Sequence, residues 1–301
     1  MGIKRFFSWI LSFFMIAAML SFAGCSQASE SAPGGGGAGK GGSPLTIRML
    51  DIGQGDSLLL GKDGKWVFID TGDVDHRPQL KAYLKQYGIK EVSKVIVTHP
   101  HADHIGGMYA LFQSVKIDDI YDNGVPTTTN TYRTYLKQIK EKKVAYHKVK
   151  AGDTIALFDG VEFKVAAPVK TINDGKSGKP DMNNNSIVGR LSYGNFSMLF
   201  TGDAEKEEEK DILDSHVDIK STVLKVGHHG SKTSSTIPFL KAVSPELALI
   251  SAGAGNSYGL PKAITLQHLE ELHIPVLRTD RQGTITITTT GSGKYEVKKE
   301  K

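Results

Sequence analysis

Cysteine is nearly missing from this chain of 301 residues, because Cys25 is the only one. An intrachain disulfide is therefore excluded. Stability must come from a core instead, and the roughly 255 residues that follow the N-terminal region are enough to bury one. The excess of positive over negative charge is also small. The formal net charge is +5, to which Lys4 and Arg5 contribute, and this is a mild bias toward anionic partners that an ordinary surface would also show.

Long hydrophobic runs are confined to the N-terminus, MGIKRFFSWILSFFMIAAMLSFAGC. Lys4 and Arg5 precede an apolar stretch that ends in small residues, which predicts a secretory signal peptide over residues 1–24. Ser12 and Ser21 interrupt the run, so we do not expect a lasting membrane span. The ending FAGC resembles the lipobox of bacterial lipoproteins, in which the cysteine becomes lipid-modified after cleavage. We therefore expect an extracytoplasmic protein anchored to the bacterial cell membrane through Cys25, with a plain signal peptide as the alternative.

Glycine, serine and proline dominate residues 25–44, and apolar residues are lacking there. This composition predicts a flexible linker that would hold a folded domain away from the membrane. No second linker of this kind follows, so residues 45–298 are expected to form a single domain and to act as a monomer.

Strand and helix patterns alternate along that domain, with residues 45–72 predicting three strands. Further strands are expected at residues 92–98, 144–149, 153–158, 161–168, 186–203 as a hairpin, 221–230 leading into a loop, 247–253, 275–279 and 284–290. Helices are expected at residues 77–88, 105–115, 129–143, 205–214 and 263–274. Strands come in two batches with helices among both, which favours two sheets with helices outside them, a layered α/β architecture.

The segment VIVTHPHADHIGG concentrates ligand-type side chains directly after an apolar strand. His99 and His101 are two residues apart, so on an extended segment both imidazoles point the same way. Asp103 and His104 follow where the chain turns into the next helix, and they can aim at a second point nearby. Imidazole and carboxylate suit Zn²⁺, Mn²⁺ or Fe. Two such ions about 3.5–4 Å apart clamp the attacking and leaving oxygens of a hydrolysis, and a cluster of surface histidines is the alternative.

The segment THPHADHIGG is similar to the signature of the metallo-β-lactamase fold hydrolases. Further blocks resemble one subfamily, the soluble metallo-β-lactamase-like domain of the competence protein ComEC, which otherwise forms a membrane DNA channel. These blocks are LDIGQGDSLLL, VFIDTG, NNNSIVGRLSYGNFSMLFTGDAE, LKVGHHGSKTSS and RTDRQGTITI. They cover essentially all of residues 45–290. The resemblance implies a four-layer αββα sandwich with two divalent metal ions, Zn or Mn, held at one edge by loops at strand ends.

The resemblance also implies the ligands. His99 and His101 match the ligands of the first metal, and Asp103 and His104 match those of the second. Asp203 matches the carboxylate that bridges both metals; on its own it would suit a helix N-cap. The last ligand is His228 or His229, a choice that the spacing leaves open, and these two histidines with Asp103 are the expected catalytic groups.

Other positions are expected around the metals. Asp70, at a strand end, should orient a ligand or the histidine loop by hydrogen bonds, or be only a turn residue. The family resemblance places Asp51, Gln54 and Asp56 near the site, although alone they form a polar turn.

Two departures from the family pattern stand out. A further metal-binding histidine is missing, because His147 lies too early in the chain and is expected to be structural or exposed. The loop MNNNS stands there instead, and Asn184, Asn185 or Ser186 would bind a metal weakly, bond to its water or hold a phosphate oxygen. Leu260 occupies a position where the subfamily carries a histidine, while His268 and His273 lie on the following helix. Ser231, Lys232 and Ser234 remain as possible phosphate contacts or as a solvated loop.

The function that these patterns imply is a metal-dependent phosphodiesterase or nuclease that acts on DNA or another anionic phosphodiester polymer, with a competence DNA-uptake channel as a possible partner. Esters of the teichoic-acid or phosphocholine type are the enzymatic alternative. A non-catalytic module that binds DNA or wall polymer is the alternative of another class. Five retained ligands argue against the latter.

Overall fold

The computed structural model describes residues 42–301. The expected signal peptide, Cys25 and the linker up to residue 41 lie outside the described residues. Within residues 42–301, no helix has both the length and the hydropathy that crossing a membrane requires.

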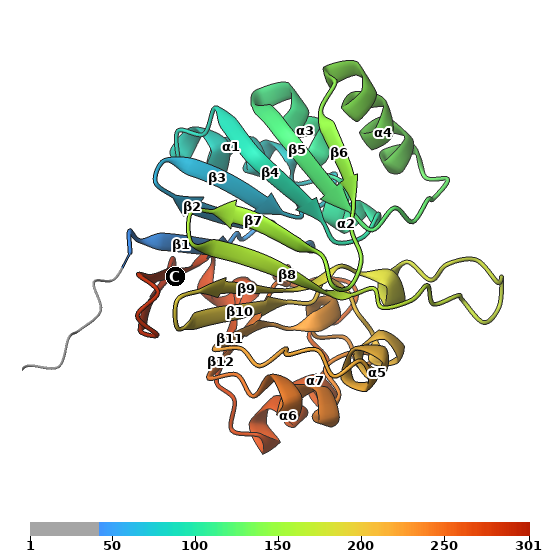
Figure 1. Cartoon of the computed structure of the whole chain (residues 1–301), viewed down its shortest axis with the longest axis vertical. Coiled ribbons are helices and arrows are strands. Elements are labelled where there is room, and N and C mark those ends of the chain that lie inside the picture. Colours follow the sequence, from blue (N-terminus) through green and yellow to red (C-terminus); the bar gives the residue numbers. More distant parts are fainter. Residues whose placement is uncertain (1–41) are drawn as a thin grey trace, which may run out of the picture. The chain divides into compact units, whose positions relative to one another are not determined.

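Two β-sheets form the centre of the domain (Figure 1). The first sheet contains, in spatial order, β15 (Tyr295–Lys299), β14 (Ile285–Thr289), β1 (Leu45–Met49), β2 (Leu58–Lys62), β3 (Lys65–Ile69), β4 (Glu91–Val97), β5 (Lys116–Asp122) and β6 (Ala145–Lys148). The second contains β13 (Val276–Arg278), β12 (Leu247–Ile250), β11 (Val223–Lys225), β10 (Phe196–Phe200), β9 (Val188–Tyr193), β8 (Val161–Ala167) and β7 (Thr154–Phe158). Strands β3 to β6 run parallel, as do β10 to β13, whereas the other neighbours pair antiparallel.

The period of two along each strand divides its apolar residues between two cores. In β1, Leu45, Ile47 and Met49 all face the core between the sheets. In β10, Met198 lies in that same core, whereas Leu199 faces the opposite side. The two sheets therefore pack face to face, each with one apolar face left for helices.

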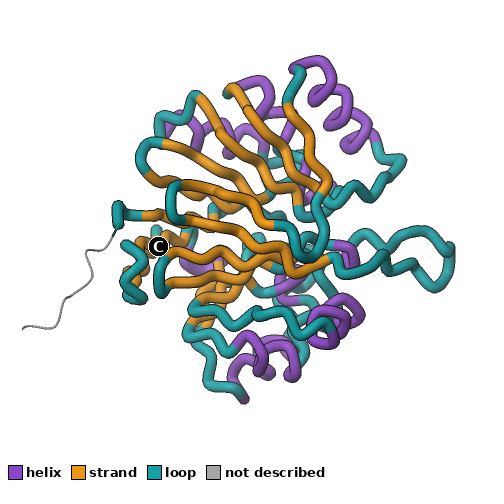
Figure 2. Tube along the Cα trace, viewed as in Figure 1, coloured by secondary structure: helices purple, strands orange, loops and turns teal. Residues whose placement is uncertain are grey.

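Helices cover both outer faces (Figures 1 and 2). The first sheet carries α1 (Arg77–Gln86), α2 (Ala102–Ile105), α3 (Met108–Ser114) and α4 (Asn130–Lys142). The second carries α5 (Lys206–Asp214), α6 (Ile237–Val243) and α7 (Ala263–Glu271), and a short α8 (Thr279–Gln282) follows β13. Separate apolar cores lie under each helix layer. The expected four-layer αββα sandwich is confirmed.

Several elements were not expected from the sequence, among them β5, α6, β15 and the short α8. Asp118 and Asp119 are unusual residues for a strand, so the sequence does not indicate β5, which is an internal parallel strand. The segment of α6 is short and carries Pro238 in its first turn, while β15 is a charged edge strand. The helix expected at residues 105–115 was wrong in extent, because it is broken into α2 and α3 at Gly106 and Gly107.

The polar loops of the domain leave the carboxyl ends of five strands. Asp70 follows β3, His99 comes shortly after β4, and Asp203 comes shortly after β10. His228 follows β11, and Ser251 follows β12. Because the carboxyl ends of parallel strands meet at one edge of a sheet, this topology gathers those side chains at one edge of the sandwich.

Candidate metal centre

The histidine loop between β4 and α2 brings two imidazoles together. His99 and His101 lie in extended backbone on either side of Pro100, with His101 as the N-cap of α2. His99 Nε2 and His101 Nδ1 are 2.9 Å apart. The first turn of α2 then carries Asp103 and His104, as the sequence predicts. His99 and His104 are fully buried, whereas His101 and Asp103 are partly exposed.

Asp203 lies between two groups of nitrogen atoms. Its Oδ2 is 3.8 Å from His99 Nε2. Its Oδ1 is 3.3 Å from His104 Nε2 and 3.7 Å from His229 Nε2. Asp203 is not the N-cap of α5, which is Glu205, so its carboxylate is free to face both groups.

His228 and His229 turn toward different oxygens of that carboxylate. Both residues have left-handed backbone, with φ of 47° and 51°. His228 Nε2 is 3.7 Å from Asp203 Oδ2, whereas His229 Nε2 is 3.2 Å from Asp103 Oδ2. The geometry places His229 with Asp103 and His104, while His228 approaches the Asp203 oxygen that His99 faces. Both residues of the pair therefore reach the site, each on its own side.

Three imidazoles of the cluster, those of His104, His228 and His229, have a fixed partner for Nδ1. His104 Nδ1 donates to Asp70 Oδ2 at 2.8 Å, and His229 Nδ1 donates to the carbonyl oxygen of Ser251 at 3.0 Å. His228 Nδ1 donates to Glu205 Oε1 at 3.0 Å. Such partners fix the tautomer and the ring orientation of metal-binding histidines.

Asp70 also holds the start of the histidine loop. Its Oδ1 accepts from the backbone N–H of Thr98 at 2.8 Å, and its Oδ2 accepts from Thr98 Oγ1 at 2.7 Å. Asp70 has left-handed backbone, with a φ of 57°, and is fully buried. Burial raises its pKa, against the opposing effect of His104.

Charge around Asp203 shapes the protonation of the cluster. Burial alone would lower the pKa of His104, but Asp203, Asp70 and Asp103 raise it well above its usual value. Burial would also lower the pKa of His229, but nearby carboxylates, mainly Asp203 and Asp56, raise it above its usual value. Burial lowers the pKa of His99 well below its usual value. The cluster without metal therefore holds protons on some imidazoles while it keeps others neutral.

A buried lysine lies behind the cluster. Lys225, in β11, pairs with Asp56 and donates to the carbonyl oxygen of Gly202 at 2.7 Å. Its Nζ is 3.9 Å from Asp203 Oδ1. Burial alone would lower the pKa of Lys225, but Asp56 and Asp203 raise it. The lysine offsets part of the negative charge beneath the site.

The donor set fits two divalent cations. One group of converging ligand atoms comes from Asp103, His104, Asp203 and His229, and a second comes from His99, His101 and Asp203. His104 Nε2 and Asp203 Oδ1 are buried, and neither has a hydrogen-bond partner among the described residues. A buried polar atom without a partner is costly, and a coordinated ion would satisfy both atoms. Imidazole and carboxylate are ligands for Zn²⁺ and Mn²⁺.

A cleft of about 920 Å³ opens onto these ligands. Its walls come from the loops after β1, β3, β4, β10, β11 and β12. They include His101, Asp103, Asp203, His228 and His229, together with Asp51, Gly53, Gln54, Asp73, Val74, Asp75, His76, Gln79, Ala102, Gly253, Ala254, Asn256, Ser257, Tyr258 and Leu260. Five aspartates and no lysine or arginine occur among these lining residues.

The sequence between residues 50 and 254 matches the family model of the metallo-beta-lactamase superfamily. The chain belongs to the metallo-β-lactamase superfamily. It is 35% identical over 258 residues to the ComE operon protein 3 of Bacillus subtilis (strain 168), a match that covers 79% of this chain and 32% of that protein. It is 28% identical over 257 residues to the competence protein ComA of Neisseria gonorrhoeae, covering 85% of this chain and 33% of that protein.

The chain thus spans about a third of the length of these curated relatives. Among solved structures, the metallo-beta-lactamase fold protein YhfI from Bacillus subtilis superposes with a TM-score of 0.54 at 12% identity, covering 85% of this chain and all of that one. These similarities confirm the resemblance to a ComEC-like, metallo-β-lactamase-fold hydrolase. Members of this fold commonly bind divalent metals, and the ligand clusters described above fit that chemistry.

The loop MNNNS, which stands where the family carries a further histidine, does not face the metal-ligand cluster. Asn185 caps the segment 172–181, donating to the carbonyl oxygens of Ile172 and Asp181. Asn184 Oδ1 accepts from the backbone N–H of Glu208 at 3.2 Å. Ser186 Oγ accepts from the backbone N–H of Asp203 at 3.1 Å, so this residue supports Asp203 from behind.

Several other expected positions lie outside the cleft. Ser231 Oγ bonds to Thr233 Oγ1, Ser234 Oγ donates to the carbonyl oxygen of Ala204, and the Lys232 side chain is exposed. His147 lies on β6 and pairs with Asp119. His268 Nδ1 donates to the carbonyl oxygen of Ser235, and neither His268 nor His273 lines the cleft.

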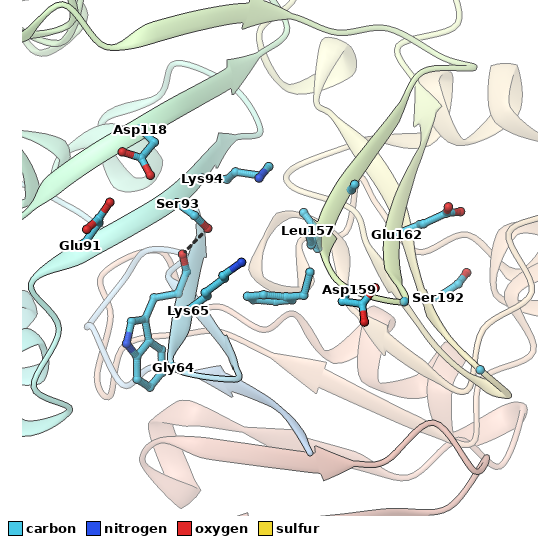
Figure 3. A pocket seen from close by; sticks show the side chains of 15 residues that line it. Gly64, Lys65, Glu91, Ser93, Lys94, Asp118, Leu157, Asp159, Glu162 and Ser192 are labelled. Atoms are coloured by element: carbon cyan, nitrogen blue, oxygen red, sulfur yellow. Dashed lines mark hydrogen bonds between the residues drawn. The ribbon is translucent and has the colours of Figure 1, made fainter. Parts of the chain in front are cut away.

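A second cavity, of about 860 Å³, lies at the beginning of β4, the end opposite the histidine loop (Figure 3). Lys65, Lys94, Glu91 and Asp118 approach it from the first sheet, and Leu157 from β7. None of the metal-ligand groups found among residues 42–301 includes a residue of this cavity.

Sequence reasoning missed the residues that support the ligands. Glu205 and Lys225 each had a signal: an acid two positions after Asp203, and a lone lysine within the apolar strand VLKV. Thr98 and Ser251 carried none, because their roles depend on contacts between separate strands.

Proposed function

We propose that the chain is an exported, lipid-anchored metallohydrolase that cleaves phosphodiester bonds, with DNA as the substrate class. The observation that carries this proposal is the division of ligands by Asp203, whose two oxygens face separate groups of imidazoles. Two cations held in that way neutralise charge on both the attacking and the leaving oxygen of a phosphoryl centre. A relative named as a competence protein supports DNA as the substrate class.

The residues have separate tasks in this proposal. His99, His101 and His228 would hold one cation, Asp103, His104 and His229 the other, and Asp203 both. Asp70 and Glu205 keep His104 and His228 in the tautomers that leave Nε2 free for metal. When bound, the cations lower the pKa of a coordinated water to about 7 and so supply a nucleophile at neutral pH.

A second candidate function rests on the acidic residues that line the cleft. Asp51, Asp73 and Asp75 line the cleft, and its lining residues include no lysine or arginine. These carboxylates suit a substrate with a cationic group, such as a phosphocholine-type envelope ester. A wall-polymer or DNA-binding module without catalysis is the remaining alternative.

Hydrolysis by the full chain tests the proposal. The metal is removed and then restored as Mn²⁺ or Zn²⁺ in separate samples, which are assayed on bis(p-nitrophenyl) phosphate and on labelled single- and double-stranded DNA. We expect turnover that requires metal, that Asp103→Asn abolishes and that Asp118→Asn leaves unchanged, since Asp118 lies at the second cavity. DNA or wall polymer that binds without being cut would favour the binding module. Turnover of phosphocholine esters alone would favour the envelope substrate.

The anchor is tested separately. We expect the full chain to incorporate labelled palmitate in a bacterial host and to remain with the membrane, and Cys25→Ser to lose both properties. A chain released to the medium without lipid would favour the plain signal peptide.

A further inference from the structure

A histidine–aspartate pair that does not belong to the metal ligands lines the same cleft. His76 Nδ1 lies 2.8 Å and 2.9 Å from the two carboxylate oxygens of Asp73. The backbone N–H of His76 also donates to Asp73 Oδ1, at 2.8 Å. Both residues line the cleft together with Asp103 and His228. The carboxylate therefore fixes the imidazole with its Nδ1 engaged and its Nε2 directed away from Asp73.

Two glycines fix this pair relative to the metal centre. A Cβ at Gly53 would lie 2.1 Å from His76 Cε1, so the imidazole packs against bare backbone, and Gly53 has a φ of +72°. A Cβ at Gly55 would lie 2.6 Å from the carbonyl oxygen of Asp103 and 3.1 Å from the backbone nitrogen of Asp73. The backbones of Asp73 and Asp103 thus both contact the same residue. The loop 53–55 sets the position of the His76–Asp73 pair against the loop that carries the ligands.

His76 is open to the cleft. Its side chain is 36% exposed, and among the described residues Nε2 has no hydrogen-bond partner. Asp73, Asp75 and Arg77 are the charged residues of its own segment. Asp51, Asp103 and Asp203 are the other acidic residues that line the cleft. Arg77 donates to the carbonyl oxygen of Gly106 and Asp51 pairs with Lys301, so each has a partner elsewhere.

The other imidazoles of the cleft, those of His101, His228 and His229, are assigned to the metal positions, and the remaining walls offer few proton donors. Leu260, Gln54 and Asn256 line the cleft but have no side-chain proton that transfers near neutral pH. Tyr258 is 66% exposed, and no partner within residues 42–301 orients its hydroxyl. Imidazole is the side chain that exchanges protons in this range.

We propose that His76 is the general acid that protonates the leaving group, with Asp73 as its positioning residue; the assignment rests on the proposed phosphodiesterase function. A hydroxide oxygen derived from water bonds to phosphorus, the P–O bond to the leaving alcohol breaks, and the electron pair of the broken bond stays on the leaving oxygen. The Nε2 proton of the His76 imidazolium passes to it and yields the free alcohol. Neutral His76 then regains a proton from water, while the Asp73 carboxylate holds the imidazole in position through Nδ1.

The test compares two esters that differ in leaving group. Thymidine 5′-(p-nitrophenyl) phosphate releases a weakly basic phenolate that needs little protonation, whereas thymidylyl-(3′→5′)-thymidine releases a strongly basic alkoxide. With the full chain loaded with Mn²⁺, we expect His76→Gln to lower kcat/KM on the dinucleotide by about 10²–10⁴-fold and on the p-nitrophenyl ester by roughly threefold or less. Asp73→Asn should show the same selectivity with a smaller loss.

His147→Gln is the matched control, because His147 also pairs with an aspartate, Asp119, at 2.7 Å but lies on β6 outside the cleft. It should change neither rate. Bound Mn²⁺ is measured for every variant and should match the wild type, and circular dichroism verifies that each variant is folded.

Equal losses on the two esters, or no loss on either, with Mn²⁺ content intact, would overturn the assignment of His76 alone. Should Mn²⁺ content fall in His76→Gln, the residue would support the metal centre, and the assignment would again be wrong. Absence of turnover by the wild-type chain on both esters would overturn the phosphodiesterase proposal and this assignment with it.

Discussion

Lys225 and Asp56 form an ion pair beneath the metal-ligand cluster, and both side chains are almost wholly excluded from solvent. Removing one partner of a buried pair leaves an uncompensated charge, which typically costs about 3–5 kcal/mol. We expect Lys225→Met to lower the free energy of unfolding by an amount of that order, because Asp56 would then face Asp203 without a cation between them. Chemical denaturation of the metal-free chain measures this directly.

Lys220→Met is the control for that variant, since Lys220 is exposed. Its free energy of unfolding should stay within about 0.5 kcal/mol of the wild type. If the two variants were equally stable, the pair would contribute nothing to the fold.

Asp203 should control both metal positions, whereas His101 should control one. We expect Asp203→Asn to abolish stoichiometric binding at both, since its two oxygens face different groups of nitrogens. His101→Ala should leave a single ion, because His101 belongs to one group only. Metal content after equilibrium dialysis separates the two cases. One ion retained in Asp203→Asn would show that its carboxylate does not bridge.

Glu205 should act on metal affinity through His228. Its Oε1 accepts from both His228 Nδ1 and Thr233 Oγ1. Burial would raise the pKa of Glu205, but the hydrogen bond from His228 outweighs that effect, and the pKa is lowered. Loss of such a partner typically weakens metal binding by about 10–100-fold. We expect Glu205→Gln to show a loss in that range at one position, measured by competition with a chelator. Glu207→Gln, two residues on and exposed, should bind as the wild type does, and an equal loss in both would refute the role of Glu205.

Metal uptake should release protons and strengthen as the pH rises. The pKa values of His104 and His229 are raised in the cluster, so these imidazoles stay protonated to higher pH than usual, and metal must displace those protons. Affinity therefore increases until the pH exceeds the raised pKa values. Calorimetry in buffers of different ionisation enthalpy, between about pH 6 and pH 8, counts the protons. Uptake without proton release across this range would contradict the prediction.

The sequence predicts the part of the site that depends on local spacing. The two-residue separation of His99 and His101 was enough to expect convergence, and their nitrogens lie 2.9 Å apart. The turn into α2 was likewise visible after His101. The four-layer fold followed from the alternation of strands and helices, together with the family resemblance.

Contacts between distant strands could not be predicted from the sequence. Nothing local indicates that Asn184 and Asn185 cap neighbouring backbone, or that Ser251 receives the Nδ1 proton of His229. The choice between His228 and His229 also required coordinates, because two successive left-handed residues send the imidazoles to opposite oxygens of Asp203. Strand β5 was missed because its three aspartates are unfavourable in strands.

The aspartates of the cleft make binding an ordered process. Five carboxylates and no lysine or arginine line the cleft, so its walls by themselves disfavour a polyanion. Two divalent cations would reverse that field at the point where the phosphate must lie. Under the proposed function, metal supply would then act as a gate, because an anionic substrate would enter only after the ions had bound, and a shortage of metal would switch off substrate capture as well as cleavage.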